Sequence, residues 1–356
     1  MSRSARTTAI VLALVALTAG CATTGTRTAA VVAIPTTGGT PAAELRLGYF
    51  PNLTHATAVY GAAADVFEQA LGSTTFTASS FPAGPAAVEA LFAGALDAAY
   101  LGPNPTINAF VQSQGEAVRV VAGATSGGAS LIVQPGIADV QALAGKRIAT
   151  PQTGGTQDIA LRHYLSQNGL AVDTAGAGDV TVLAQDNPVT LSAFRAGQVD
   201  GAWVPEPWAS RLVLEGGGTV LLDERDLWPG GEFVTAQLVV RTDYLRAHPE
   251  TVRRLVAGSV EANRQIDADP GNAKRVLNAA LDTLTGEPLA PLVLDRAFGQ
   301  LRPTDDPIAT SLATSAQHAF ETGLVEQADL SGIYDLGLLR EVLGRDIDDA
   351  GLGALR

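Results

Sequence analysis

Residues 84–101 read GPAAVEALFAGALDAAYL, and residues 187–204 read NPVTLSAFRAGQVDGAWV. At a constant offset of 103, the two copies match at a proline, a glycine and an aspartate, namely Pro85 and Pro188, Gly94 and Gly197, and Asp97 and Asp200. Matches of these residue types are not explained by the alanine-rich composition alone, so each copy is interpreted as one supersecondary unit.

Each copy predicts a helix, a glycine stop and a strand. The proline suits the first helical turn, where its missing N–H is not needed. The glycine suits the left-handed residue that ends a helix, and the aspartate then leads into a short apolar strand. A polar or proline-rich loop follows each copy, at residues 102–105 and 205–208.

The same offset extends towards the N-terminus. Residues 45–50 fall on 148–153, and residues 75–81 fall on 178–184, all with strand-like composition. The sequence therefore predicts an α/β fold with two βαβαβ lobes. A long apolar run at 233–241 is expected to return to the first lobe, and helical patterns after it are expected to pack outside that lobe. The expected boundaries are 44–127 with 234–356 for lobe 1, and 128–233 for lobe 2.

Bulk composition narrows the class of protein. The chain has 356 residues, of which 46% are hydrophobic and 17% charged, and its net charge is −13. This composition excludes disorder for most of the length, and the acidic charge argues against a nucleic-acid partner. It does not exclude a small anion, because backbone N–H groups can bind one inside an acidic protein.

The N-terminus resembles a lipoprotein signal. Basic residues precede an apolar run at 9–17, and Thr-Ala-Gly then leads to Cys21, the only cysteine. The expectation is a signal peptide over 1–21 with Cys21 as the lipidated residue, although an ordinary secretory signal is the alternative. Residues 22–43 are expected to be a flexible tether.

Several turns carry candidate ligand contacts. Asn52 and Thr54 either cap a helix or face a ligand. A Gly-Gly pair at 127–128 suits a hinge or a close backbone approach, but it is also ordinary in loops. The turn at 151–158 opens a helix with Gly-Gly-Thr, which has the geometry of an anion cradle without the lysine of a nucleotide-binding loop.

Two tryptophans and a carboxylate occur within residues 203–208. Trp203 and Trp208 predict a pocket wall, with core packing as the alternative. Glu206 either accepts a hydrogen bond from an ammonium group of a ligand or complements the following helix N-terminus.

Recognisable catalytic and cofactor motifs are absent from the sequence. It contains no G-x-S-x-G elbow, no Walker motif and no complete dinucleotide fingerprint, and its four histidines lack metal-ligand spacing. A secreted two-lobed protein without such motifs is interpreted as a binder, without catalytic residue, metal or cofactor.

Five segments, in their order and spacing over about residues 44–300, resemble the extracytoplasmic solute-binding proteins of nitrate, sulfonate and taurine ABC importers. They are LGYFPN at 47–52, FPAGP at 81–85, GALD at 94–97, GPNP at 102–105 and WVPEPW at 203–208. The resemblance implies a type II periplasmic-binding fold with the ligand in the cleft between the lobes. It also implies an extracytoplasmic, lipid-anchored monomer that delivers a small anionic or zwitterionic solute to ABC permease subunits.

Carried over from that family, an oxyanion would be held by helix N-termini. The candidate ligand-binding residues are Asn52, Thr54, His55, Asn104, Gly128, Ser130, Gly155, Thr156, Gln157, Trp203 and Glu206. A ligand-sensing receptor subunit and a secreted enzyme on the same fold are the alternative functions, and Glu206 favours an organic solute over bare nitrate.

Overall fold

Both copies of the repeated stretch fold as predicted in the computed structural model, which describes residues 40–327 and 329–352. The helices α3 (Gly84–Phe92) and α6 (Asn187–Arg195) each have a proline in the first turn. Gly94 and Gly197 follow them with a φ of +67° each, a conformation that costs a residue with a Cβ more than it costs glycine. The predicted glycine stop is therefore confirmed in both lobes.

The repeated aspartate fastens the strand that follows it to the first strand of the same lobe. The carboxylate of Asp97 accepts from the backbone N–H of Arg46 at 2.9 Å, and the N–H of Asp97 donates to the carbonyl of Arg46 at 2.9 Å. Asp200 makes the same two bonds with Arg147, each at 2.8 Å. The arginines are 101 positions apart and the aspartates 103, so the second lobe has two more residues between its first strand and this aspartate.

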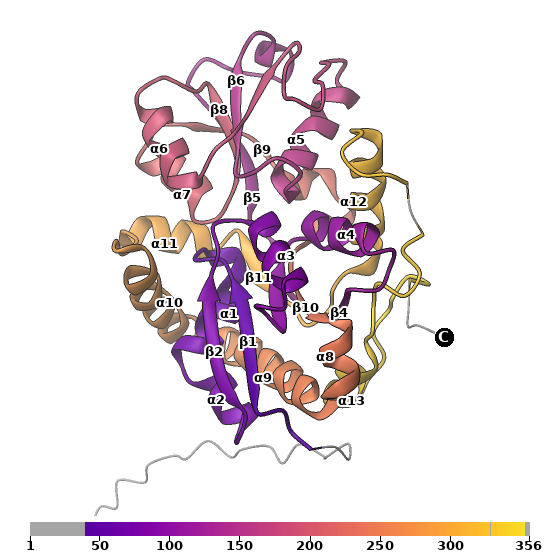
Figure 1. Ribbon diagram of the computed structural model, residues 1–356. Helices are drawn as coiled ribbons and strands as arrows, with labels where there is room; N and C mark the ends of the chain where they lie inside the picture. The colour runs from indigo at the N-terminus through magenta and orange to yellow at the C-terminus, as the bar shows by residue number, and fades with distance from the viewer. Residues whose placement is uncertain (1–39, 328, 353–356) are drawn as a thin grey trace, which may run out of the picture. The chain divides into compact units, whose positions relative to one another are not determined.

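Two sheets carry the fold (Figure 1). In each, the third strand of the lobe pairs with an antiparallel neighbour. The first sheet has the order β11 (Leu301–Pro303), β4 (Val118–Gly127), β10 (Val234–Arg241), β3 (Ala98–Leu101), β1 (Glu44–Tyr49), β2 (Thr75–Ser80). The second has the order β7 (Thr181–Ala184), β6 (Arg147–Thr150), β8 (Gly201–Pro205), β5 (Ala129–Val133), β9 (Thr219–Asp223). We call the residues around these sheets the first and second lobes.

The chain crosses between the lobes where β4 leads into β5 and where β9 leads to β10. Because β10 returns to the centre of the first sheet, the predicted return strand is confirmed. The strand β7 begins three residues later than the repeat offset predicts, at Thr181.

Helices cover the sheets. Those before β10 are α1 (Ala56–Ala63), α2 (Val66–Leu71), α4 (Pro103–Gln112), α5 (Thr156–Gln167) and α7 (Trp208–Leu214), besides α3 and α6. Those after β10 are α8 (Thr242–Ala247), α9 (Pro249–Ala268), α10 (Pro270–Thr285), α11 (Pro291–Phe298), α12 (Ala309–Glu321) and α13 (Gly337–Leu343). Short 3₁₀ helices span Leu53–His55, Gln141–Leu143, Glu224–Leu227 and Pro229–Gly231.

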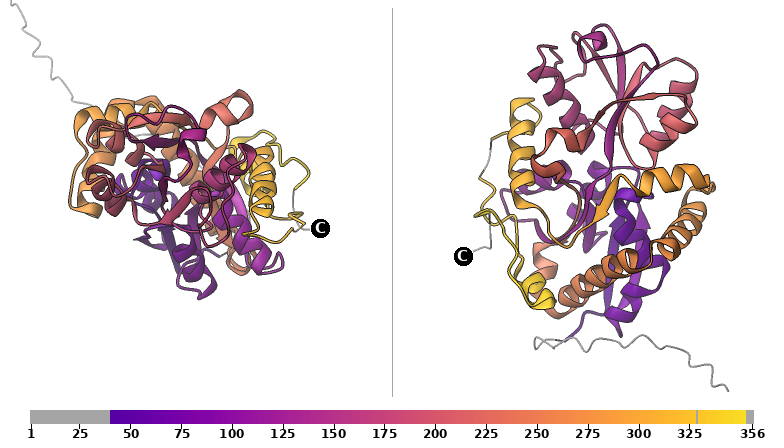
Figure 2. Two further views of the ribbon diagram at one scale, coloured as in Figure 1. Left: turned by 90° about the horizontal axis from the view of Figure 1, so that it is seen from above. Right: turned by 180° about the vertical axis from the view of Figure 1, so that it is seen from behind.

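The late helices do not all pack on the first lobe, as the sequence had suggested. The helix α11 contacts α7, and α12 contacts both α4 and α5, so two helices after β10 reach the second lobe. The right-hand view of Figure 2 shows α12 beside α5.

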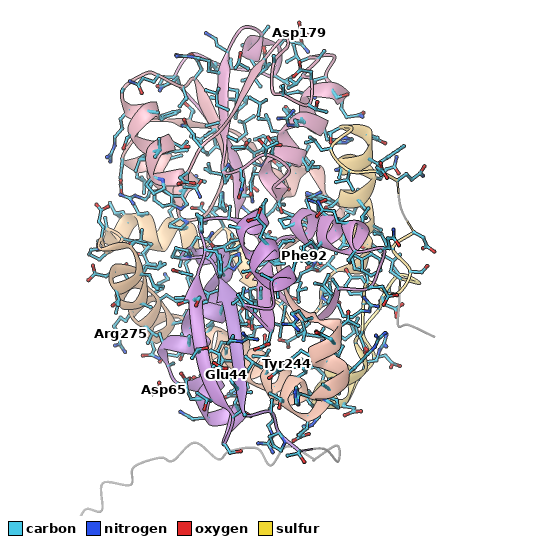
Figure 3. All side chains as sticks on the ribbon, in the orientation of Figure 1. Glu44, Asp65, Phe92, Asp179, Tyr244 and Arg275 are labelled. Carbon is cyan, nitrogen blue, oxygen red and sulfur yellow. The ribbon has the colours of Figure 1, made fainter. Side chains whose placement is uncertain are left out.

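Each lobe has its own apolar core. The first core surrounds Leu45, Leu47 and Tyr100, while the second lobe buries residues on both faces of its sheet. Figure 3 draws the side chains, with Asp65 at the surface of the first lobe and Asp179 at the surface of the second.

Candidate ligand-binding site

A cavity of about 40 Å³ is lined by residues of both lobes. First-lobe residues at its wall are Phe50, Asn52, Thr54, His55, Pro82, Ala83, Gly84, Gly102, Pro105 and Thr235. Second-lobe residues are Pro151, Gln152, Gly155, Thr156, Gln157, Asn187 and Pro205. None of these side chains is an arginine, lysine, aspartate or glutamate, so a charged ligand would find no counter-ion at this wall.

Four helices begin at the cavity. The helices α3, α4, α5 and α6 each contribute their N-cap or first residues to the wall, and none of the four N-cap side chains caps its helix. The backbone N–H groups of Thr156 and Gln157 in particular have no recorded acceptor among residues 40–327 and 329–352. Free N–H groups and the helix dipoles give this wall a positive potential without a charged side chain.

The 3₁₀ helix after β1 supplies polar side chains. The carboxamide oxygen of Asn52 accepts from the N–H of His55 at 3.2 Å and from the hydroxyl of Thr54 at 2.8 Å. These bonds fix the side chains of Asn52 and Thr54 at the wall. Asn52 therefore caps this turn, as one of its two sequence interpretations required, and it also lies at the cavity.

His55 is a neutral donor. The backbone N–H of Phe50 donates to His55 Nδ1 at 3.3 Å, so the assigned tautomer carries its proton on Nε2. Burial lowers the pKa of His55 to about 3, which keeps the ring uncharged at physiological pH. The ring also lies 4.2 Å from that of Phe50, centroid to centroid. The Nε2–H can donate a hydrogen bond to a ligand with many acceptor atoms, such as an oxyanion.

The lobes touch each other around the cavity. The N–H of Leu53 donates to the carbonyl of Glu206 at 3.1 Å. A Cβ on Gly102 would lie only 2.3 Å from Thr156 Oγ1, so the missing side chain lets α5 approach the start of α4. The site is therefore enclosed by direct contacts between the lobes.

The structure brings six of the eleven predicted residues to the cavity wall: Asn52, Thr54, His55, Gly155, Thr156 and Gln157. The other five lie elsewhere: Asn104, Gly128, Ser130, Trp203 and Glu206.

Trp203 is a core residue. Its indole is fully buried in the second lobe and donates from Nε1 to Glu224 at 2.8 Å. Trp208 stacks under the guanidinium of Arg211. The predicted tryptophan wall is therefore wrong, because one indole fills the core and the other supports an arginine.

Glu206 acts as a helix cap. Its carboxylate accepts from the backbone N–H and the hydroxyl of Ser210, both at 3.0 Å. Burial raises the pKa of Glu206 to about 7. The side chain does not line the cavity, so it gives no reason to expect an ammonium group on the ligand.

Asn104, Gly128 and Ser130 serve the scaffold. Asn104 donates from Nδ2 to the carbonyl of Ser315 in α12 at 3.2 Å. Gly128 has a φ of +80° at the crossing between β4 and β5, and its carbonyl accepts from the N–H of Glu206 at 2.8 Å. The hinge interpretation of the glycine pair fits this position, and Ser130 is buried in β5.

The sequence reasoning missed several wall residues, and the repeat could have found them. Gly84 and Asn187 open the two repeated copies. At the same offset of 103, Gly102 follows β3 and Pro205 is the last residue of β8. Because the repeat relates the two lobes, residues at equivalent strand ends meet at one cavity. Thr235, Phe50 and Gln152 carried no such signal.

Two negative findings concern the part of the chain that the structure describes. Within residues 40–327 and 329–352, no three histidine, cysteine or acidic side chains gather as metal ligands would. No helix in those ranges is both long and apolar enough to cross a bilayer.

Comparison with protein families gives a match to the model described as the NMT1-like family, over residues 38–281. A protein of Brucella abortus (strain 2308), named only as a binding protein, is 31% identical over 191 residues, which are 53% of this chain and 57% of that relative. The taurine-binding periplasmic protein of Escherichia coli (strain K12) is 28% identical over 223 residues, 60% of this chain and 67% of the relative.

Among solved structures, the alkanesulfonate-binding protein SsuA of Xanthomonas axonopodis pv. citri, bound to MOPS, has a TM-score of 0.67 and 24% identity. The match covers 81% of this chain and 96% of that one. At this identity the likeness shows the fold, and it confirms the expected two-sheet periplasmic-binding architecture. The chain spans 57% of the length of the first curated relatives that it matches.

Proposed function

Because the chain belongs to the NMT1-like family, we propose that it is the solute-binding component of an ABC importer and that its solute is a small oxyanion. The observation that carries the proposal is the cavity wall, which combines helix N-termini and hydroxyl groups with no charged side chain. Relatives named for binding taurine and alkanesulfonates support the same class of solute.

The chemistry of the wall favours an oxyanion over a cation. Free N–H groups at the start of α5, the hydroxyl of Thr156 and the Nε2–H of His55 are all donors. An anion at a helix N-terminus gains from the dipole, whereas a cation there would be repelled. No aspartate or glutamate at the wall offsets this preference.

The size of the cavity favours a compact group. A volume of about 40 Å³ holds roughly three water molecules, at about 10–15 Å³ each by the same kind of measure. A nitrate, a bicarbonate or the head group of a sulfonate is of this order, while a long alkyl chain is not. We propose that the solute is nitrate, bicarbonate or a short sulfonate such as taurine.

A thermal-shift screen of the full chain tests the class of solute. The panel contains nitrate, bicarbonate, sulfate, taurine, ethanesulfonate and octanesulfonate, with choline and glucose as cationic and neutral controls. A solute at a hundred times its dissociation constant should stabilise the fold by about 2.7 kcal/mol. Stabilisation by one of the compact oxyanions supports the proposal, and stabilisation by choline or glucose alone would exclude it.

Two substitutions at one position test the role of the backbone. Thr156→Ala removes the hydroxyl and keeps the N–H, whereas Thr156→Pro removes both at the first position of α5, where proline is well tolerated. If the N–H binds the oxyanion, Thr156→Pro must weaken binding clearly more than Thr156→Ala. Equal affinities in the two variants would show that this N–H does not contact the solute.

We also propose that Cys21 carries a lipid and that the protein acts outside the cytoplasm, next to its permease. Cys21 and residues 22–39 of the expected tether lie outside the described residues, so this part rests on the sequence motif and on relatives named as periplasmic. The predicted end of the tether at residue 43 is wrong, because Ala42 is buried and its N–H donates to Thr251 Oγ1 at 2.8 Å. Mass spectrometry of the N-terminal peptide would detect the acyl group.

A further inference from the structure

A pair of stacked histidines joins α12 to the second lobe. His163 lies on α5 and His318 on α12, and their rings stack with centroids 3.5 Å apart and an interplanar angle of 12°. Glu321, one turn after His318, accepts from His163 Nδ1 at 3.2 Å. This contact is outside the cavity and has no part in the proposed binding chemistry.

Two hydrogen bonds hold α12 to the first lobe. The carbonyl of Ser315 accepts from Asn104 in α4, and the hydroxyl of Ser311 accepts from the N–H of Val234 at the start of β10 at 2.9 Å. Neither bond involves a group that titrates near neutral pH. The helix α12 thus bridges the lobes, with fixed bonds on one side and an imidazole pair on the other.

We propose that the stacked His163–His318 pair is a pH-sensitive latch, which holds α12 against α5 at neutral pH and releases it on acidification. Two neutral imidazoles stack favourably, whereas two imidazolium rings at this separation repel each other. Glu321 can neutralise one positive charge but not both.

The surroundings of the pair fit this role. Burial, and then the neighbouring His163, lower the pKa of His318 to about 4, and burial lowers the pKa of His163 against the opposing effect of Glu321. Both rings are therefore neutral at pH 7 while stacked. A released histidine has a pKa of about 6.5, so protons favour the released form as the pH falls.

Few other charged groups face the pair. On α5, Asp158 and Arg162 lie within two turns of His163 and pair with each other at 2.9 Å. The helix α4 and the strand β10 also pack against α12. The helix α4 has no titratable side chain. The strand β10 has one titratable side chain, Arg241, which ends the strand and pairs with Asp243.

Two aromatic neighbours complete the surroundings. Trp228 lies beside the ring of His318, with centroids 5.8 Å apart, and stacks on Phe233 before β10. In the 3₁₀ helix that precedes Trp228, Glu224 is buried and accepts from Trp203. Burial raises the pKa of Glu224 to about 7, so this carboxyl is mostly uncharged below pH 6, where the latch opens.

The sign of the effect follows from the direction of the shifts. Because the pKa of His318 is lower in the latched state, latching is complete above about pH 6.5 and is lost as the pH falls towards about 4. For His318 alone, the latched-to-released ratio should fall by up to about 60-fold between pH 7 and pH 4.5.

Distance measurements between spin labels test the latch without any solute, so they do not depend on the proposed function. The labels are placed on exposed positions of the full chain, Ser166→Cys in α5 and Thr310→Cys in α12, in a Cys21→Ser background. Double electron–electron resonance is recorded from pH 7.5 to pH 4.5, with circular dichroism to verify the fold. Nuclear magnetic resonance of the four histidine rings follows their protonation.

We expect one distance at neutral pH and a growing population at longer distance below pH 6. His318→Phe keeps a flat ring in the stack but cannot be protonated, so it should hold the short distance to pH 4.5. His248→Phe, which changes a histidine outside the pair, should behave as the unmodified chain. An unchanged distance in the unmodified chain, or the same change in His318→Phe, would overturn the proposal.

Discussion

Gly102 is the position where a single methyl group should prevent the lobes from closing around the solute. Alanine suits the backbone there, which has a φ of −70° and a ψ of 166°. The new Cβ would lie 2.3 Å from Thr156 Oγ1 and 3.4 Å from the carbonyl of Thr235. Either Thr156 turns its hydroxyl out of the site, or the lobes separate at this contact.

The loss of solute affinity can be estimated from the first of these alternatives, in which Thr156 turns away. Forcing the threonine from its rotamer costs about 0.5–1.5 kcal/mol, and losing one hydrogen bond to a charged solute costs about 1.5–3 kcal/mol. The sum of about 3 kcal/mol corresponds to a loss of affinity of about 150-fold. In the solute-free chain the loss of stability should stay within the rotamer cost of about 0.5–1.5 kcal/mol, because alanine suits the backbone of Gly102.

Isothermal titration calorimetry measures the loss of solute affinity in Gly102→Ala, Thr156→Ala and the double variant. Thr156 Cβ would remain 3.5 Å from the new methyl group, an ordinary contact, so the double variant should bind no worse than Thr156→Ala alone. Full affinity in Gly102→Ala, or a simple addition of the two losses in the double variant, would refute the close approach of α5 to α4 as the basis of binding.

Four further predictions concern single residues. His55→Phe removes the Nε2–H but keeps the ring, so solute affinity should fall about 10- to 100-fold in a calorimetric titration. Ionised Glu206 is disfavoured in the fold because its pKa is raised to about 7, so stability should fall by up to about 3 kcal/mol between pH 4.5 and pH 7. Glu206→Gln should remove this contribution in denaturant titrations and leave solute affinity unchanged, while buried Glu224, whose pKa is also raised to about 7, keeps its own contribution; weaker binding would instead support a ligand contact. Asp97→Asn should destabilise the chain by about 2 kcal/mol, and Asp200→Asn, whose side chain is more exposed, by about half as much, as thermal melts would show. Cys21→Ser should release the protein from the membrane fraction, and unchanged fractionation would exclude the lipid anchor.

The repeat made the fold predictable because its matched residues have the same structural role in both lobes. Its proline, glycine and aspartate each have one structural task, and Asp97 and Asp200 perform the same task in both lobes. Positions separated by loops of unequal length were predicted less well. The strand β7 begins three residues late mainly because it is shorter, with four residues where β2 has six. In the pairing register, Thr77 opposes Arg46 and Thr181 opposes Arg147, so the equivalent positions are displaced by only one residue.

The site was predictable where a turn opens a helix. Asn52 caps the 3₁₀ helix after β1, Thr156 is the first residue of α5, and both line the cavity. Trp203 was not predictable, because every residue of β8 is buried and the strand therefore shows no alternation that would tell one face from the other. The role of Glu206 could not be predicted from the sequence, because a carboxylate before a helix can accept either from the helix N–H groups or from a ligand.

The central claim is that an uncharged wall of helix N-termini binds a compact oxyanion between the lobes. A crystal structure of the full chain with the tightest-binding solute from the screen tests it most directly. We predict oxyanion oxygens within hydrogen-bond distance of the N–H groups of Thr156 and Gln157 and of His55 Nε2, with no arginine or lysine nitrogen within 4 Å. A solute bound elsewhere, or one held at this site by a basic side chain, would contradict the account.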